Sequence, residues 1–188
     1  MGLDKIRKDI DALDTKIAEL LMQRLDYAEQ VVQTKIDDGV TNIYLAERED
    51  DIMENILKNI PEERKDTSRA LMRKIVEISR THQFNILNQQ VPGLLDEYLE
   101  DVEIPEEPTR IRFEAIRPNI EGQMGVICTL IGDAHFNIQE VQQMDNSVDN
   151  ASSRLWFTVD GDIYDPKMKT LLIQLAQESE GFSILSID

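Results

Sequence analysis

Apolar residues in the first part of the chain recur at steps of three and four, which is the period of an amphipathic helix. Leu3, Ile6, Ile10, Leu13, Ile17 and Leu20 form this series, and it continues through Arg24 to Tyr27 and Val31. No Gly or Pro interrupts residues 3–36, and "DDGV" at 37–40 is a stop signal with Gly39 as the cap. The pattern predicts one helix about 50 Å long at 1.5 Å per residue.

Two further helices are predicted before the first clear break. One runs from about Tyr44 to Asn59, ahead of Pro61, and the other begins with Asp66 or Thr67 as N-cap and ends before Pro92-Gly93. An apolar seam along the whole first helix needs a partner of equal length, which the third helix is too short to provide. We therefore expect an intertwined dimer.

The periodicity changes after an acidic, proline-containing segment at 91–109, which we interpret as a linker. "RIRFEAI" alternates as a half-buried strand does, and "MGVICTLIGDA" reads as a helix. "NIQEVQQMDN" and "SSRLWFTVDGD" are predicted strands, "DPKMKTLLIQLAQES" a helix capped by Asp165 with Pro166 at its first position, and "FSILSID" a last strand. The order β-α-β-β-α-β is the ferredoxin-like arrangement.

Polar side chains interrupt the apolar stripes of all three N-terminal helices. Arg24 and Lys35 lie on the first, Arg48 on the second, and Ser79 and Gln83 on the third. A buried unpaired charge costs several kcal/mol, so each needs a partner. One interpretation pairs Arg24 and Arg48 with internal carboxylates such as Asp14, Glu49 or Glu77. The other is a cavity rich in donors that binds an anion with several oxygens.

Composition narrows the chemistry. The net charge of −17 disfavours nucleic acid and anionic membranes as partners, and most of the 20 basic side chains lie in residues 1–90. A single cysteine, Cys128, excludes an internal disulfide and suits a reducing cytoplasm. The stripes contain no nucleophile, phosphate loop or metal-ligand spacing, so we expect neither a metal nor a cofactor. Such donors suit a reaction that needs conformational control and charge stabilisation.

The same residues carry a family resemblance. "LDKIRKDIDALDTKIAELLMQR", Lys35, "YLAERED" and "EISRTHQ" resemble the all-helical class of chorismate mutases, whose fold is an intertwined dimer of three-helix chains. The resemblance implies conversion of chorismate to prephenate, with no cofactor, in aromatic amino-acid biosynthesis. Two alternatives remain open: an isochorismate-pyruvate lyase on the same scaffold, and a non-catalytic amino-acid-sensing or docking subunit of a partner enzyme.

The resemblance also implies roles for individual residues. Arg24 would bind a substrate carboxylate together with Arg7 from a second chain, and Ser79 would add a contact near the ring carboxylate. Lys35 and Gln83 would donate to the ether oxygen, Arg48 would fix the pyruvyl carboxylate, and Glu49 would accept from the ring hydroxyl. Leu45 departs from the family, where members often carry Asp, and this puts turnover and substrate choice in question.

Residues 110–188 resemble an ACT domain, a ferredoxin-like module that binds amino acids. The resemblance rests on "RPNIEGQMGVICTLIGDAHFNIQEV", in which Gly122, Gln123 and Met124 precede or open a helix and Asn137-Ile138 opens a strand. It implies regulation by an aromatic amino acid bound near these five residues. The predicted organisation is thus an all-α mutase domain at 1–90, a linker at 91–109 and an α+β ACT-like domain at 110–188.

Overall fold

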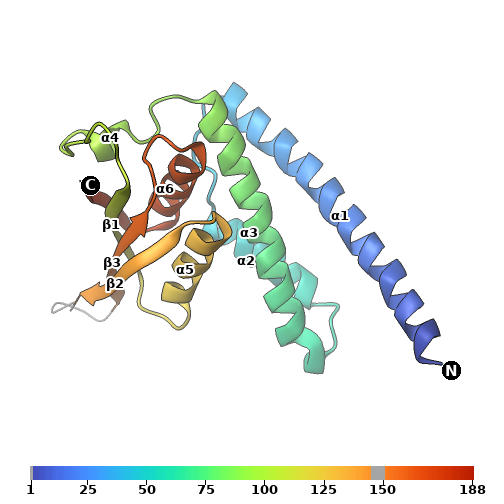
Figure 1. Cartoon of the computed structure of the whole chain (residues 1–188). Coiled ribbons are helices and arrows are strands. Elements are labelled where there is room, and N and C mark those ends of the chain that lie inside the picture. The colour runs from blue at the N-terminus through green and yellow to red at the C-terminus, as the bar shows by residue number, and fades with distance from the viewer. Residues whose placement is uncertain (1, 145–150) are drawn as a thin grey trace. The chain divides into compact units, whose positions relative to one another are not determined.

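The computed structural model describes residues 2–144 and 151–188, and the chain divides into two compact units, Met1–Ile86 and Leu87–Asp188. The first unit is helical and the second contains a sheet (Figure 1). The predicted strand at 137–146 is described as far as Met144, and its last two residues lie outside the described range.

Helix α1 spans Leu3–Asp37, close to the predicted range. It ends in a hydrogen-bonded cap at Gly39, whose φ of 71° is in the left-handed region that favours glycine. Gly39 N–H donates to Ile36 O at 3.0 Å, and Val40 N–H donates to Lys35 O at 2.8 Å. This pair of bonds is the Schellman motif, so the predicted stop at Gly39 is confirmed.

Helix α2 spans Ala46–Leu57, and α3 spans Lys65–Gln90. The prediction that Asp66 or Thr67 precedes α3 as its N-cap is wrong, because both residues lie inside its first turn. A 3₁₀ turn, η1 (Glu62–Arg64), follows Pro61 and runs directly into the helix. The carbonyl of Pro61 accepts from Arg64 N–H at 2.9 Å, so the chain is already helical before Asp66.

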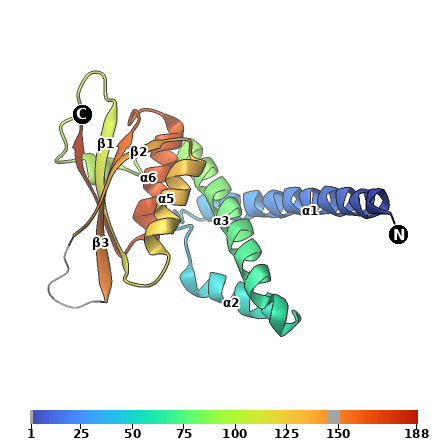
Figure 2. The ribbon, with the colours of Figure 1, turned by 60° about the horizontal axis from the view of Figure 1, so that its bottom comes forward.

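The apolar seam of α1 is open to solvent in the single chain. Leu3, Ile6, Ile10, Leu13, Ile17 and Leu20 are between 39% and 63% exposed. Figures 1 and 2 show the N-terminal part of α1 running away from α2 and α3, whereas its C-terminal part lies beside α3. The prediction that α3 is too short to cover the seam agrees with this exposure.

The second unit holds a four-stranded antiparallel sheet with strand order β2-β3-β1-β4. Its elements run β1 (Arg110–Pro118), α5 (Gln123–Asp133), β2 (Asn137–Met144), β3 (Ser152–Asp160), α6 (Pro166–Glu178) and β4 (Gly181–Ile187). The predicted element order is therefore the observed one. A short helix, α4 (Asp96–Leu99), lies in the segment preceding β1.

One face of this sheet is covered by α5 and α6, as Figure 2 shows. The alternation predicted for β1 is present, with Ile111, Phe113 and Ala115 fully buried. Phe113 stacks on Phe157 of β3, its register partner, with ring centroids 5.5 Å apart. Helix α6 begins as predicted, with the Asp165 carboxylate accepting from Lys167 N–H at 2.8 Å.

No helix within residues 2–144 and 151–188 combines the length and the apolar character needed to cross a membrane.

Candidate functional site

A cavity of about 550 Å³ lies among the three helices of the first unit. All three helices and the loop between α1 and α2 contribute to its wall. Apolar side chains such as Ala28, Val31, Ile52 and Val76 line part of it. Its polar lining is Arg24, Lys35, Arg48, Glu49, Ser79, Arg80 and Gln83. The structure thus brings together six of the residues expected to form the site, and adds Arg80.

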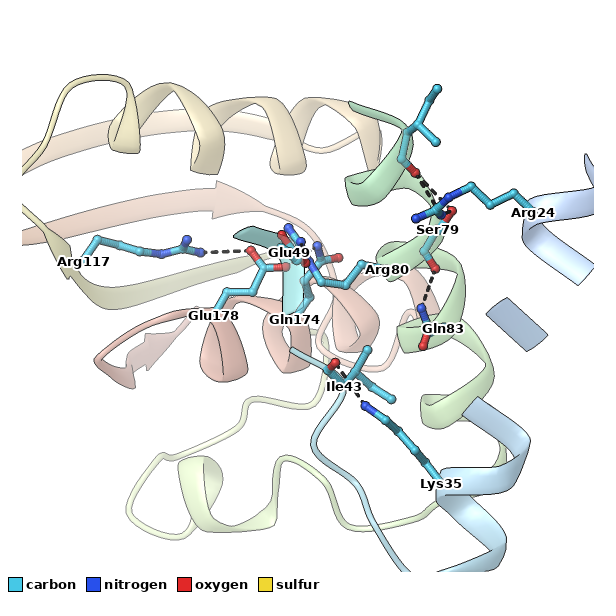
Figure 3. Close-up of polar contacts among 11 residues, drawn as sticks. Arg24, Lys35, Ile43, Glu49, Ser79, Arg80, Gln83, Arg117, Gln174 and Glu178 are labelled. Atoms are coloured by element: carbon cyan, nitrogen blue, oxygen red, sulfur yellow. Dashed lines mark hydrogen bonds and ion pairs between the residues drawn. The ribbon is translucent and has the colours of Figure 1, made fainter. Parts of the chain in front are cut away.

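Arg24 lies on α1 and reaches α3 across the cavity (Figure 3). Its Nη1 donates to Ser79 Oγ and to Ile75 O, the latter at 3.4 Å. Ser79 Oγ in turn donates to Ile75 O at 3.0 Å. Burial lowers the pKa of the Arg24 guanidinium, and the nearby Glu49 carboxylate opposes that shift. Arg24 stays a cation at neutral pH, with donors left for a ligand.

Lys35 lies in the last turn of α1, and its side chain contacts the loop that follows the helix. Its Nζ donates to Asn42 O at 2.9 Å and to Ile43 O at 3.3 Å. Burial lowers the pKa of this ammonium. An ammonium has three protons, so two hold the loop and one remains for a ligand in the cavity.

Gln83 lies one turn after Ser79 on α3. Its Nε2 donates to Ser79 O at 3.3 Å (Figure 3). An amide nitrogen carries two protons, and the second is therefore available to an acceptor in the cavity. Lys35 and Gln83 both line the cavity, so two donors of different charge face the same space.

Glu49 on α2 forms an ion pair with Arg80 on α3, between Glu49 Oε1 and Arg80 Nη1. Arg80 is 8% exposed, and its guanidinium carbon lies 5.2 Å from the ring centroid of Tyr44. Arg80 is not among the residues that the sequence pattern places in the site. It lies four residues after Val76 and three before Gln83, so the spacing that selected Ser79 also fits Arg80.

Among the described residues neither Arg24 nor Arg48 forms an ion pair with an internal carboxylate, although Glu49 is near enough to Arg24 to oppose the lowering of its pKa. Glu49 is held by Arg80, and Glu77 is held by Lys74 at 2.6 Å. Arg48 lines the cavity, and over residues 2–144 and 151–188 it has no ion pair. These cations are therefore available to a ligand.

Arg7 is not among the residues that line this cavity. It lies on the first turns of α1, with its side chain 66% exposed and its Nη1 3.9 Å from Asp4 Oδ1. Arg7 and Arg24 are 17 residues apart on one helix, about 25 Å at 1.5 Å per residue. Within one chain Arg7 therefore cannot reach the cavity.

The residues expected to bind an effector lie at two places in the second unit. Gly122 is the N-cap of α5, with φ of 88°, and Gln123 and Met124 begin the helix. Asn137 and Ile138 begin β2, beyond the other end of α5. The eleven residues of α5 separate the two groups by about 16 Å. One chain does not bring them together.

The lining of the cavity defines what it can bind. Arg24, Lys35, Arg48 and Arg80 are cations and Glu49 is an anion, which leaves an excess of positive charge in a protein whose net charge is −17. Arginine side chains and an ammonium are the groups that bind carboxylates. No cluster of His, Cys, Asp and Glu suited to a metal ion occurs among the described residues. The cavity suits a small dianion with further hydrogen-bond acceptors.

Comparison with known families supports this chemistry. Residues 6–84 match the family model described as chorismate mutase type II. The matched residues include Arg7 and every polar side chain that lines the cavity. This family implies an isomerase. The match does not extend to the sheet of the second unit.

Comparison with curated proteins gives no match. Among solved structures, 22 chains match. One is described as "GqqA- a novel type of quorum quenching acylases", at 16% identity and a TM-score of 0.42. The match covers 45% of this chain and 45% of that one, so the matched part of this chain spans less than half the length of that protein.

Proposed function

We propose that this chain, which carries a chorismate mutase type II domain at residues 6–84, converts chorismate to prephenate. The reaction is a rearrangement within one molecule: a carbon–oxygen bond of the enolpyruvyl ether breaks as a carbon–carbon bond forms. It needs no nucleophile, metal or cofactor. The observation that carries the proposal is the convergence of cations and neutral donors from three helices on one cavity within the matched residues.

The two carboxylates of chorismate account for the arginines. Arg24 would bind the ring carboxylate, with Ser79 beside it, since these two side chains already contact each other. Arg48, which lines the cavity from α2, would bind the pyruvyl carboxylate. Binding both carboxylates holds the enolpyruvyl chain over the ring, which is the conformation the rearrangement needs.

Lys35 and Gln83 would stabilise the transition state. Negative charge grows on the ether oxygen as its bond to the ring carbon breaks, and both side chains have a proton left to donate to it. Their existing bonds to main-chain carbonyls fix both donors before the substrate arrives. Donors that are already oriented cost little reorganisation during the reaction.

We further propose that two chains pair along α1 and share their sites. The exposed seam from Leu3 to Leu20 would be buried by a second copy, and the same pairing would carry Arg7 of that copy toward the first chain's Arg24. Arg7 would then supply the second guanidinium for the ring carboxylate.

The decisive experiment is the loss of chorismate absorbance with purified protein, followed by identification of the product. Prephenate confirms the proposal. Release of pyruvate from isochorismate would favour the lyase, and no acceleration of either reaction would favour a non-catalytic subunit. Sedimentation of the same sample tests the dimer.

For the second unit we propose a regulatory ACT-like role, with residues 1–90 catalytic and 91–109 as the connecting segment. Its β-α-β-β-α-β order and strand order β2-β3-β1-β4 support this. Because Gly122 and Asn137 lie at opposite ends of α5, an effector that contacts both would bind between two copies. Thermal shift and activity with added Phe, Tyr and Trp test this role.

A further inference from the structure

Two neighbouring residues on α3 connect this helix to the other two. Ser79 accepts a hydrogen bond from Arg24 of α1, and Arg80 forms an ion pair with Glu49 of α2. Figure 3 shows the Arg24–Ser79 contact, with Arg80 on the same stretch of α3. Ser79 and Arg80 therefore fix, from one helix, side chains that α1 and α2 contribute to the cavity.

Arg80 is held more firmly than the other arginines of the cavity. Its side chain is 10% exposed, that of Glu49 is 28% exposed, and the Tyr44 ring lies within cation–π distance of the guanidinium at 5.2 Å. Tyr44 precedes Leu45, the N-cap of α2, which has no side-chain cap of its own. Arg80 thus contacts both the start of α2 and its first turn.

The ion pair with Arg80 engages one of the two carboxylate oxygens of Glu49. Oε1 of its carboxylate contacts Arg80, whereas Oε2 has no hydrogen-bond partner among residues 2–144 and 151–188. Glu49 lines the cavity, so this oxygen can accept from a ligand hydroxyl. A carboxylate fixed through one oxygen presents the other in a defined place, which a freely rotating glutamate does not.

We propose that Arg80 is a positioning residue that fixes Glu49 so that one carboxylate oxygen accepts from the ring hydroxyl of the substrate. The inference rests on the proposed function, and Arg80 itself does not contact the substrate. Its guanidinium is already engaged by Glu49 and lies near the Tyr44 ring. Arg80 also offsets the charge of Glu49, which would otherwise repel a dianion.

A double-mutant cycle on kcat/KM for chorismate tests this role. We expect Arg80→Met to lower kcat/KM by about 10- to 100-fold, since misplacing a binding group by an ångström costs up to about 100-fold. Arg80→Lys keeps the positive charge but lacks the planar guanidinium, so its kcat/KM should lie between those of Arg80→Met and the wild type. In the Glu49→Ala background, Arg80→Met should change kcat/KM by less than about 2-fold, because nothing remains to be positioned. Arg69→Met is the matched control, as Arg69 is on α3 and pairs with Asp66.

The outcomes separate the two proposals. If the wild-type protein does not accelerate the conversion of chorismate, the proposed function fails and this inference fails with it. If the wild type is active but Arg80→Met lowers kcat/KM by the same factor in the Glu49→Ala background as in the wild type, Arg80 acts independently of Glu49. This inference alone is then wrong. If Arg80→Met and Arg80→Lys both fail to fold in thermal melting, Arg80 serves stability only, and the inference is again overturned.

Discussion

Replacing Arg24 with leucine tests whether this side chain serves substrate binding or the stability of the folded protein. Arg24 interrupts the apolar series of α1, is partly buried, and its neighbours in the cavity are mostly cations. Ser79 Oγ keeps its bond to Ile75 O without it, so the substitution leaves no orphaned hydroxyl. Removing a partly desolvated charge that forms no ion pair should leave the free energy of unfolding unchanged or raise it by about 1 kcal/mol.

The same substitution should lower kcat/KM strongly, although it does not lower the free energy of unfolding. A charged hydrogen bond to a carboxylate contributes about 1.5–3 kcal/mol, and a guanidinium makes two of them. Losing about 3–5 kcal/mol of transition-state binding corresponds to a fall in kcat/KM of about 10²- to 10⁴-fold.

The assay pairs chorismate disappearance with urea unfolding of the same variant. Arg73→Leu is the control, because Arg73 is an exposed arginine on α3 that does not line the cavity. Retained activity in Arg24→Leu would refute the role of Arg24 in binding. Unfolding of Arg24→Leu, with Arg73→Leu intact, would show instead that Arg24 is part of the framework.

Three further predictions concern the same site. Burial lowers the pKa of Lys35, and only the ammonium can donate, so kcat/KM should fall on the alkaline side at a pH below the ordinary lysine range; Lys35→Arg should move that fall to higher pH in a pH–rate profile. Gln83 is a neutral donor, so Gln83→Glu should confine activity to acidic pH, where a carboxyl can donate, and a Gln83→Glu protein as active at pH 8 as at pH 5 would contradict the donor role. Arg7→Ala and Arg24→Ala proteins, each inactive, should regain part of the wild-type rate after mixing and subunit exchange, because one site of the hybrid keeps both arginines; exchange without recovery would exclude a shared site.

Local signals in the sequence are sufficient for most of the secondary structure. The three-and-four period of α1, the glycine at position 39 and the Asp165-Pro166 start of α6 each act within a few residues. The helix α3 begins two or three residues before the predicted start, because Pro61 opens a 3₁₀ turn that runs into the helix without an N-cap side chain.

The candidate site was predictable as a set of residue types but not as a set of contacts. Periodicity assigns Arg24 to the seam of α1 and Ser79 to the inner face of α3, since it fixes which side of a helix a residue occupies. It does not fix how two helices cross, and the crossing decides which side chains meet. Periodicity therefore gives no partner for Arg80, and only the tertiary structure pairs it with Glu49.

The sequence by itself determined that three helices carry donors in apolar stripes, because helical period and residue chemistry are both local properties. The tertiary structure decided which donors are already engaged: Lys35 by the loop carbonyls, Gln83 by Ser79 O, and Glu49 by Arg80. It also set Gly122 and Asn137 at opposite ends of α5, although the sequence pattern treats them as one motif. These contacts depend on the rotation and crossing of whole elements, which arise only when the elements pack.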